Sequence, residues 1–131
     1  HIYLSSFREQ RGMLHTVVKV DYRKLNIINI HLGLDDEERG IQIRELLDFI
    51  KKLGDEPYIV VGDFNQGGVT VEEDILKDVA KELGKSNILT FPTGLDRIDY
   101  IFVSSNIEVI DYDVIIKDMS DHYPVFAKIK I

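Results

Sequence analysis

Apolar residues alternate with polar ones, or recur at helical spacing, along almost the whole chain, and short polar segments separate these runs. Two runs rich in β-branched residues, 13–20 and 24–31, flank a polar segment at 21–23 and predict a β-hairpin. A continuous apolar run at 58–61 predicts a strand that is covered on both faces. Further strands are expected at 100–103, 108–116 and 125–131.

Two segments show the spacing of an amphipathic helix. The first covers 36–53, where Asp35 can cap the N-terminus and a glycine follows the end. The second is predicted over 71–83, because Thr70 and Glu73 form a capping-box pattern ahead of a regular apolar stripe. Strands outnumber helices, so the pattern favours an α+β fold.

The composition indicates one globular domain that comprises residues 1–131, since 44% of them are hydrophobic and 30% are charged. No internal repeat, linker or low-complexity segment suggests a second domain. No apolar stretch approaches the roughly 20 residues that a membrane-spanning helix needs. We therefore expect no membrane span, and the cytoplasm is the default location.

The net charge of −7 gives no basic surface overall, which argues against tight binding along a nucleic acid backbone. The absence of cysteine excludes disulfides, thiolate nucleophiles and thiolate metal sites. The chain opens without methionine and directly in strand-like sequence. We therefore expect that a further segment normally precedes His1.

Polar side chains that could take part in catalysis or metal binding stand at the ends of apolar runs. They comprise two imidazoles, three carboxylates and an amide, namely His31, His122, Asp63, Asp99, Asp121 and Asn65. Metal-assisted attack on phosphate uses these groups, whereas a structural core has little use for all of them together. The pattern predicts that these loop ends converge into one pocket.

Each group also has a plainer interpretation. On extended backbone Asp63 and Asn65 would share a face and could bind a hard cation or orient water, but both could instead bond to nearby backbone in a turn. His122 is the best candidate for a general base, with Asp99 fixing its tautomer. Asp121 is a natural magnesium ligand, although residues 121–124 also suit a simple turn.

His31 could bond to a phosphoryl oxygen or to the leaving group, where negative charge accumulates as the bond breaks. A lone histidine on a strand is more often structural. The sequence alone leaves both interpretations open.

Three motifs together resemble those of the endonuclease/exonuclease/phosphatase superfamily, which includes DNase I-like nucleases, apurinic endonucleases, inositol phosphatases and sphingomyelinases. They are Val-Gly-Asp-Phe-Asn at 61–65, Arg-Ile-Asp-Tyr-Ile at 97–101 and Ser-Asp-His-Tyr-Pro at 120–124. The resemblance covers most of the chain. It implies a DNase I-like four-layer αββα sandwich.

The resemblance also implies a role for each candidate residue. His122 would be the catalytic histidine and Asp99 its carboxylate partner. Asp63 and Asn65 would position water, contact phosphate and help to bind metal. Asp121 would be a metal ligand, and His31 would bind the phosphoryl group. The implied reaction is in-line attack of water on a phosphodiester or phosphomonoester, with Mg²⁺ or Mn²⁺ as cofactor.

The chain departs from the family pattern in its first part. Family members carry an asparagine and then a glutamate, the principal metal ligand, on an N-terminal half that is not found here. The chain thus resembles a C-terminal portion with an incomplete sandwich. Such a portion would expose apolar sheet surface, which we expect the missing N-terminal segment or a second copy of the chain to cover.

The sequence therefore favours a magnesium-dependent phosphoesterase that acts on a small or lipid-like phosphate ester. A nuclease of the same superfamily is one alternative and would need a basic, aromatic-lined groove. A catalytically silent fragment or interaction module, which lacks the principal metal ligand, is the other.

Overall fold

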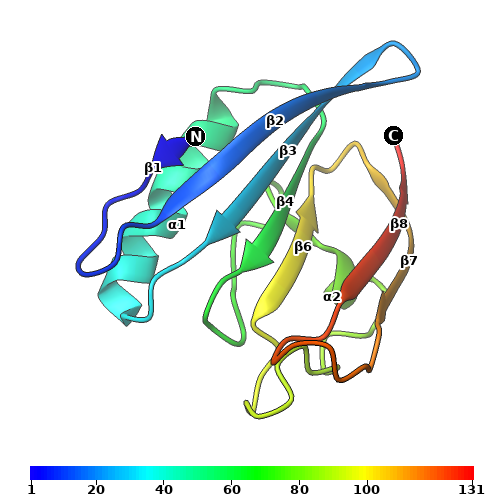
Figure 1. Cartoon of the computed structure of the whole chain (residues 1–131). Helices are drawn as coiled ribbons and strands as arrows, with labels where there is room; N and C mark the ends of the chain where they lie inside the picture. Colours follow the sequence, from blue (N-terminus) through cyan, green and yellow to red (C-terminus); the bar gives the residue numbers. More distant parts are fainter.

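The computed structural model describes all residues, 1–131, as two sheets and two helices (Figure 1). The larger sheet has six strands in the order β1-β2-β3-β4-β6-β5, and the smaller sheet pairs β7 with β8. The α+β prediction is confirmed. The elements are β1 (Ile2–Tyr3), β2 (Gly12–Val20), β3 (Arg23–His31), α1 (Asp36–Lys51), β4 (Tyr58–Asp63), β5 (Lys77–Asp78), α2 (Val79–Glu82), β6 (Asp99–Val103), β7 (Glu108–Val114) and β8 (Val125–Lys130).

The predicted hairpin is confirmed as β2 and β3, which pair antiparallel over their full length. Asp21 and Tyr22 form the two-residue turn with positive φ angles of 46° and 67°. Positive φ at both central residues is typical of the type I′ turn, whose twist matches that of the strands. The turn thus fixes the register of the two strands.

Helix α1 begins as the sequence predicts, because the Asp35 side chain accepts hydrogen bonds from the backbone N–H groups of Glu37 and Glu38 at 3.0 and 3.1 Å. The helix connects β3 to β4, which lie parallel and adjacent in the sheet. A parallel pair needs such a crossover connection. The carboxyl ends of β3 and β4 therefore meet at one edge of the molecule.

The helix predicted over 71–83 is wrong over most of its length. Only α2 at its end is helical, and Asp78 rather than Thr70 caps it. The residues before α2 form β5, which pairs with β6. Asp78 also binds the buried Arg97 guanidinium at 2.6 Å, so tertiary contacts outweigh the helical preference of this segment.

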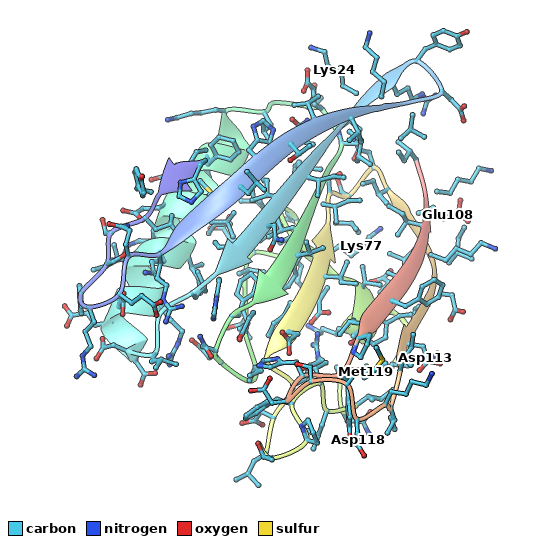
Figure 2. All side chains as sticks on the ribbon, in the orientation of Figure 1. Lys24, Lys77, Glu108, Asp113, Asp118 and Met119 are labelled. Atoms are coloured by element: carbon cyan, nitrogen blue, oxygen red, sulfur yellow. The ribbon has the colours of Figure 1, made fainter.

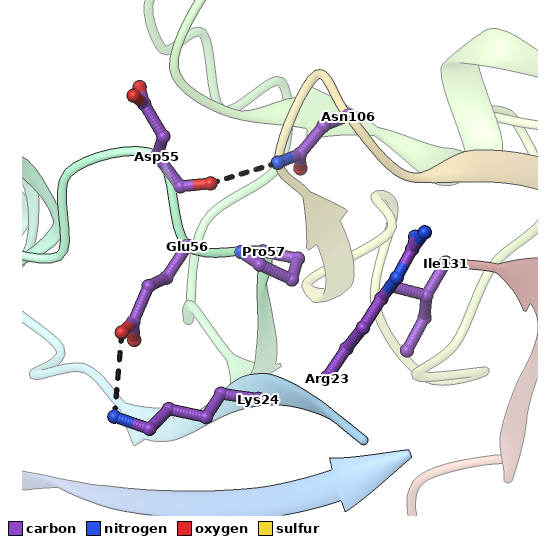
Figure 3. A pocket seen from close by; sticks show the side chains of 7 residues that line it. All are labelled: Arg23, Lys24, Asp55, Glu56, Pro57, Asn106 and Ile131. Carbon is purple, nitrogen blue, oxygen red and sulfur yellow. Dashed lines mark hydrogen bonds and ion pairs between the residues drawn. The ribbon is translucent and has the colours of Figure 1, made fainter. Parts of the chain in front are cut away.

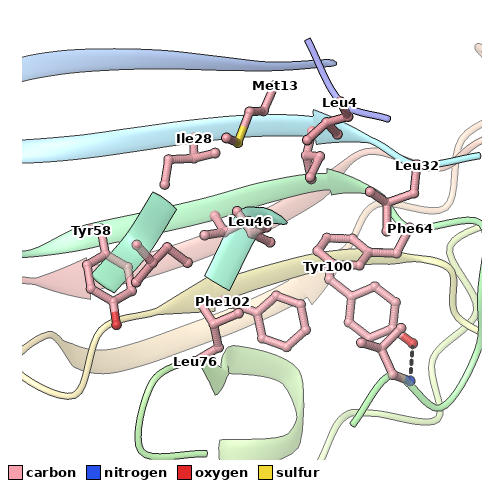
Figure 4. Close-up of a cluster of buried hydrophobic side chains, with 14 residues drawn as sticks. Leu4, Met13, Ile28, Leu32, Leu46, Tyr58, Phe64, Leu76, Tyr100 and Phe102 are labelled. Carbon is pink, nitrogen blue, oxygen red and sulfur yellow. Dashed lines mark hydrogen bonds between the residues drawn. The ribbon is translucent and has the colours of Figure 1, made fainter. Parts of the chain in front are cut away.

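The main core lies between α1 and the six-stranded sheet (Figure 4). Leu46 and Ile50 of the helix belong to one cluster with Ile28, Ile30 and Val60 of β3 and β4. These strand residues alternate with others that point to the opposite face of the sheet. The helix therefore covers the central part of one face of the sheet.

A second core lies on the opposite face, where β7 and β8 pack against the sheet. Val125, Ala127 and Ile129 of β8 point inward to this cluster. Leu14 of β2 points to the same face beyond this cover and is 50% exposed. We call this side of the sheet, which β7 and β8 cover only in part, the open face.

The two ends of the sheet differ in chemistry. At the hairpin end, a charged pocket is lined by Lys24 and Glu56, 3.7 Å apart, and by Asn106, whose amide donates to the carbonyl of Asp55 (Figure 3). Figure 2 shows Lys24 at the end opposite to the loop that carries Met119. None of the predicted site residues lines this pocket.

Neither helix is long and apolar enough to cross a membrane.

Candidate active site

Three of the predicted residues form a row across adjacent strands. The register pairs His31 of β3 with Asp63 of β4, and Asp63 with Asp99 of β6. Directly opposed residues project from the same face of a sheet, which here is the open face. The pairing of three strand ends thus brings together residues that are far apart in the sequence.

Asp63 stands at the centre of this row. Its Oδ2 atom lies 3.5 Å from Nε2 of His31 and 3.7 Å from Nε2 of His122. The His31 side chain is 58% exposed, whereas that of Asp63 is only 17% exposed. One carboxylate is thus shared by two imidazoles, and one of these faces solvent.

His122 comes from the loop that joins β7 to β8, and it closes over the row. Its Nδ1–H donates to Oδ2 of Asp99 at 2.8 Å. The ring of Phe91 lies against the imidazole, with ring centroids 4.9 Å apart. These contacts fix the ring so that Nε2 is left to face Asp63 and solvent.

The surroundings of His122 change its basicity. Burial of the ring lowers the pKa of His122, because it disfavours the charged form. The hydrogen bond to Asp99 and the negative charges of Asp99, Asp63 and Asp121 act in the opposite direction and prevail. The pKa of the imidazole is therefore raised above its ordinary value.

Thr90 completes the site and was not anticipated from the sequence. It is fully buried, and its hydroxyl donates to Oδ2 of Asp99 at 2.7 Å. The same hydroxyl accepts the backbone N–H of Asp99, and the carbonyl of Thr90 accepts the N–H of Tyr123. Thr90 thus holds both the strand of Asp99 and the residue after His122. The only signal in the sequence is its place beside the apolar Ile88 and Leu89.

Asn65 does not extend the strand, so the predicted face shared with Asp63 is wrong. Its φ of 50° places it in the left-handed region, so Asp63 and Asn65 do not share a face of extended backbone. Its backbone N–H donates to Oδ1 of Asp63 at 2.7 Å, and its side-chain amide donates to the carbonyl of Leu32 at 2.8 Å. Asn65 therefore ties the end of β4 to the end of β3, and its amide oxygen takes no hydrogen bond.

A candidate metal-binding group is present in the row. Single ligand atoms of Asp63, Asp99 and His122 all lie within 4.8 Å of one another. Asp121 is exposed and lies outside this group, where it accepts a hydrogen bond from the hydroxyl of Ser120 at 3.1 Å. The structure thus brings together five of the predicted residues through direct contacts, and Asp121 borders them.

Comparisons with solved structures support the fold. The structure is similar to a mannosyl-6-phosphatase from Bacteroides thetaiotaomicron, with a TM-score of 0.75 and 23% identity over 93% of this chain and 58% of that chain. It is also similar to the human nocturnin catalytic domain, solved with a bound sulfate anion, with a TM-score of 0.80 and 21% identity over 98% of this chain and 57% of that chain.

Sequence comparisons agree. The chain is 23% identical to a phospholipase C from Staphylococcus aureus, across 89% of this chain and 50% of that protein. It is 26% identical to the uncharacterized protein YbhP from Escherichia coli strain K12, across 94% of this chain and 54% of that protein. The chain thus spans about half the length of the curated relatives it matches. The endonuclease/exonuclease/phosphatase family model matches residues 4–122, so the chain belongs to this family.

Proposed function

We propose that this chain carries the catalytic residues of a metal-dependent phosphoesterase, in which water attacks a phosphodiester or phosphomonoester in line. The single observation that carries the proposal is the row of His31, Asp63 and Asp99, with His122 bonded to Asp99 above it. The names of two similar proteins, a phospholipase and a phosphatase, describe action on phosphate esters. Hydrolysis of a phosphodiester and hydrolysis of a phosphomonoester both begin with the same attack of water on phosphorus.

His122 acts as the general base in this proposal. Nδ1 is held by Asp99, so the free Nε2 can accept the proton of an attacking water. The water oxygen forms a bond to phosphorus while the bond to the leaving oxygen breaks, and the leaving oxygen takes up a proton. Asp99 stabilises the imidazolium that forms.

In this proposal Asp63 orients the attacking water, and His31 binds the phosphoryl group. Asp63 can orient the attacking water, because its Oδ2 lies within 3.7 Å of the base. The exposed imidazole of His31 can donate to a phosphoryl oxygen, on which negative charge develops. Their positions on paired strands give them a rigid support.

The residues present suit a divalent cation. Carboxylate and amide oxygens are ligands that Mg²⁺ and Mn²⁺ accept, and Asp63, Asn65 and Asp121 would hold the ion. Bound there, it would neutralise negative charge on the phosphate. The unbonded amide oxygen of Asn65 supports its part in this assignment, and the place of Asp63 among clustered ligand atoms supports that of Asp63, while Asp121 follows from its place beside His122 in the sequence.

The net charge of −7 favours a small or lipid-like phosphate ester over long nucleic acid. Salt-dependent binding of duplex DNA would instead support the alternative of a nuclease. A chain that hydrolyses neither type of ester and binds no Mg²⁺ would support the alternative of a silent module.

The test measures turnover of bis-p-nitrophenyl phosphate and p-nitrophenyl phosphate with Mg²⁺, Mn²⁺ or EDTA. We expect His122→Ala and Asp63→Ala to lower kcat by about 10²- to 10⁴-fold. Asp48→Asn, which changes an exposed carboxylate on α1, is the matched control and should leave turnover unchanged. Unchanged turnover in the His122 or Asp63 variant would overturn the proposal.

A further inference from the structure

Helix α1 buries three polar side chains, although their desolvation free energy would be lower at surface positions. Glu38, Arg39 and Gln42 are only 4%, 6% and 0% exposed. Buried polar groups are costly unless they are bonded, so each should have definite partners. Arg39 and Gln42 find partners in the two loops that follow His31 and Asp63, whereas Glu38 bonds the segment between β1 and β2.

The first loop is the turn that follows His31. The backbone N–H of Gly33 donates to Oε1 of Gln42 at 2.8 Å, and the carbonyl of Gly33 accepts from Nη1 of Arg39 at 3.2 Å. The N–H of Leu32 donates to the carbonyl of Asp63 at 2.9 Å, and the carbonyl of Leu32 accepts from Asn65. The backbone polar groups of Leu32 and Gly33 are therefore all held by other elements.

Glycine at position 33 lets this turn approach α1 closely. A Cβ at position 33 would lie 2.3 Å from the carboxylate of Glu38, which itself accepts from the N–H of Phe7 and from Gln42. The turn therefore packs directly onto the polar side chains of α1, with no space between them.

Arg39 connects this turn with the second loop. While Nη1 donates to Gly33, Nε of the same guanidinium donates to the side chain of Gln66 at 3.1 Å. Gln66 directly follows Asn65. One planar, rigid group thus joins the loop that follows His31 with the loop that follows Asp63, and Asp36 pairs with its Nη2.

We propose that Arg39 is a positioning residue that clamps together the loops that follow His31 and Asp63, and so holds the ends of β3 and β4 in the alignment that their strand pairing begins. It acts through backbone and loop contacts and does not itself reach the row of candidate catalytic side chains. A lysine at this position cannot replace it, because an ammonium on a flexible stem lacks the fixed fork of donors. The inference rests on the proposed function where turnover is measured. The measurement of hydrogen exchange does not depend on that function.

The first measurement is backbone amide hydrogen exchange, residue by residue, by NMR. We expect Arg39→Lys to raise exchange at Gly33 and Asn65 by about tenfold, the effect of losing one charge-assisted hydrogen bond. Amides in the middle of the sheet, such as Ile28, should keep their rates. Arg44→Lys is the matched control, because Arg44 is exposed on the same helix.

The second measurement is steady-state turnover of the same nitrophenyl esters. Arg39→Lys should lower kcat by about 10- to 100-fold, since small displacements of catalytic groups are costly. KM should stay within about threefold, because the clamp does not contact substrate. If the unmodified chain shows no turnover, the proposed function fails, and the exchange measurement still decides on the clamp.

Gln66→Ala provides a second variant if Arg39→Lys does not fold. It removes one acceptor from a loop and leaves α1 intact, so exchange should rise at Asn65 and not at Gly33. The proposal is overturned if Arg39→Lys and Arg44→Lys exchange alike at both amides. It is also overturned if the increase spreads evenly over the sheet, which is the result expected of a merely structural residue.

Discussion

Nδ1 of His122 lies 2.8 Å from Oδ2 of Asp99, although 23 residues separate the two along the chain. The contact joins the loop before β8 to the first residue of β6. It holds the imidazole in one orientation and raises its pKa against the effect of burial. The acid–base behaviour of the site therefore depends on this pair.

The first prediction concerns pH. Because the folded-state pKa of His122 is raised, the pair stabilises the fold fully below the unfolded pKa of about 6.5, and this contribution is lost as the pH rises through the folded-state pKa. In the proposed reaction turnover has the opposite dependence, because His122 must be neutral to act as the base. We expect turnover to rise with pH through that same pKa.

Asp99→Asn tests this prediction. Removal of the charge should lower the pKa of His122 and move the rising limb of the pH–rate profile to lower pH, while kcat falls by about 10²- to 10⁴-fold. NMR titration of the His122 ring measures the pKa directly. Equal midpoints in the variant and the unmodified chain would contradict the role of Asp99.

The second prediction concerns Thr90. Thr90→Val keeps the shape but removes the hydroxyl that serves Asp99, so the free energy of unfolding should fall by about 1 to 3 kcal/mol. Thr90→Ser keeps the hydroxyl and should retain the orientation of His122, with a smaller loss from the missing methyl. Urea unfolding measures both. A valine variant as stable as the serine variant would show that the hydrogen bonds contribute little.

The third prediction concerns the close approach of β3 and β4. Gly62 has a φ of 148°, and a Cβ there would lie 1.8 Å from the carbonyl oxygen of Ile30. Gly62→Ala should lower stability by at least about 3 kcal/mol, because strain and a backbone clash add together. Gly40→Ala is the control, since open space surrounds this helical position and alanine should stabilise by about 0.5 to 1 kcal/mol. Thermal unfolding that ranks the two variants equally would contradict the clash.

The fourth prediction concerns the open face. We expect the chain on its own to pair with a second copy, so that light scattering gives a mass above the 15.1 kDa of one chain. Leu14→Lys places a charge on the open face and should restore the single-chain mass. Val17→Lys is the matched control, because Val17 is equally 50% exposed on the same strand but points to the other face. A single-chain mass for the unmodified protein would contradict the prediction.

The sequence determined most of the elements and identified the candidate residues of the site. The hairpin, α1 and the strands follow from local periodicity and turn signals, which are properties of neighbouring residues. His31, Asp63, Asp99 and His122 were identifiable because each ends an apolar run or belongs to a recognisable motif. Their convergence was a sound expectation, since strand ends of one sheet meet at one edge.

Tertiary structure alone decided four features. The segment before α2 has a helical pattern, yet residues 71–76 form turn and loop and Lys77–Asp78 form β5, because pairing with β6 and the Asp78–Arg97 ion pair outweigh local preference. Asn65 turns out of the strand to bond Leu32, a partner 33 residues away. The hydroxyl of Thr90 and the guanidinium of Arg39 gain their roles only from partners on other elements. Local patterns record the preferences of neighbouring residues, whereas the partner of a buried polar group is chosen by the packing of the whole chain.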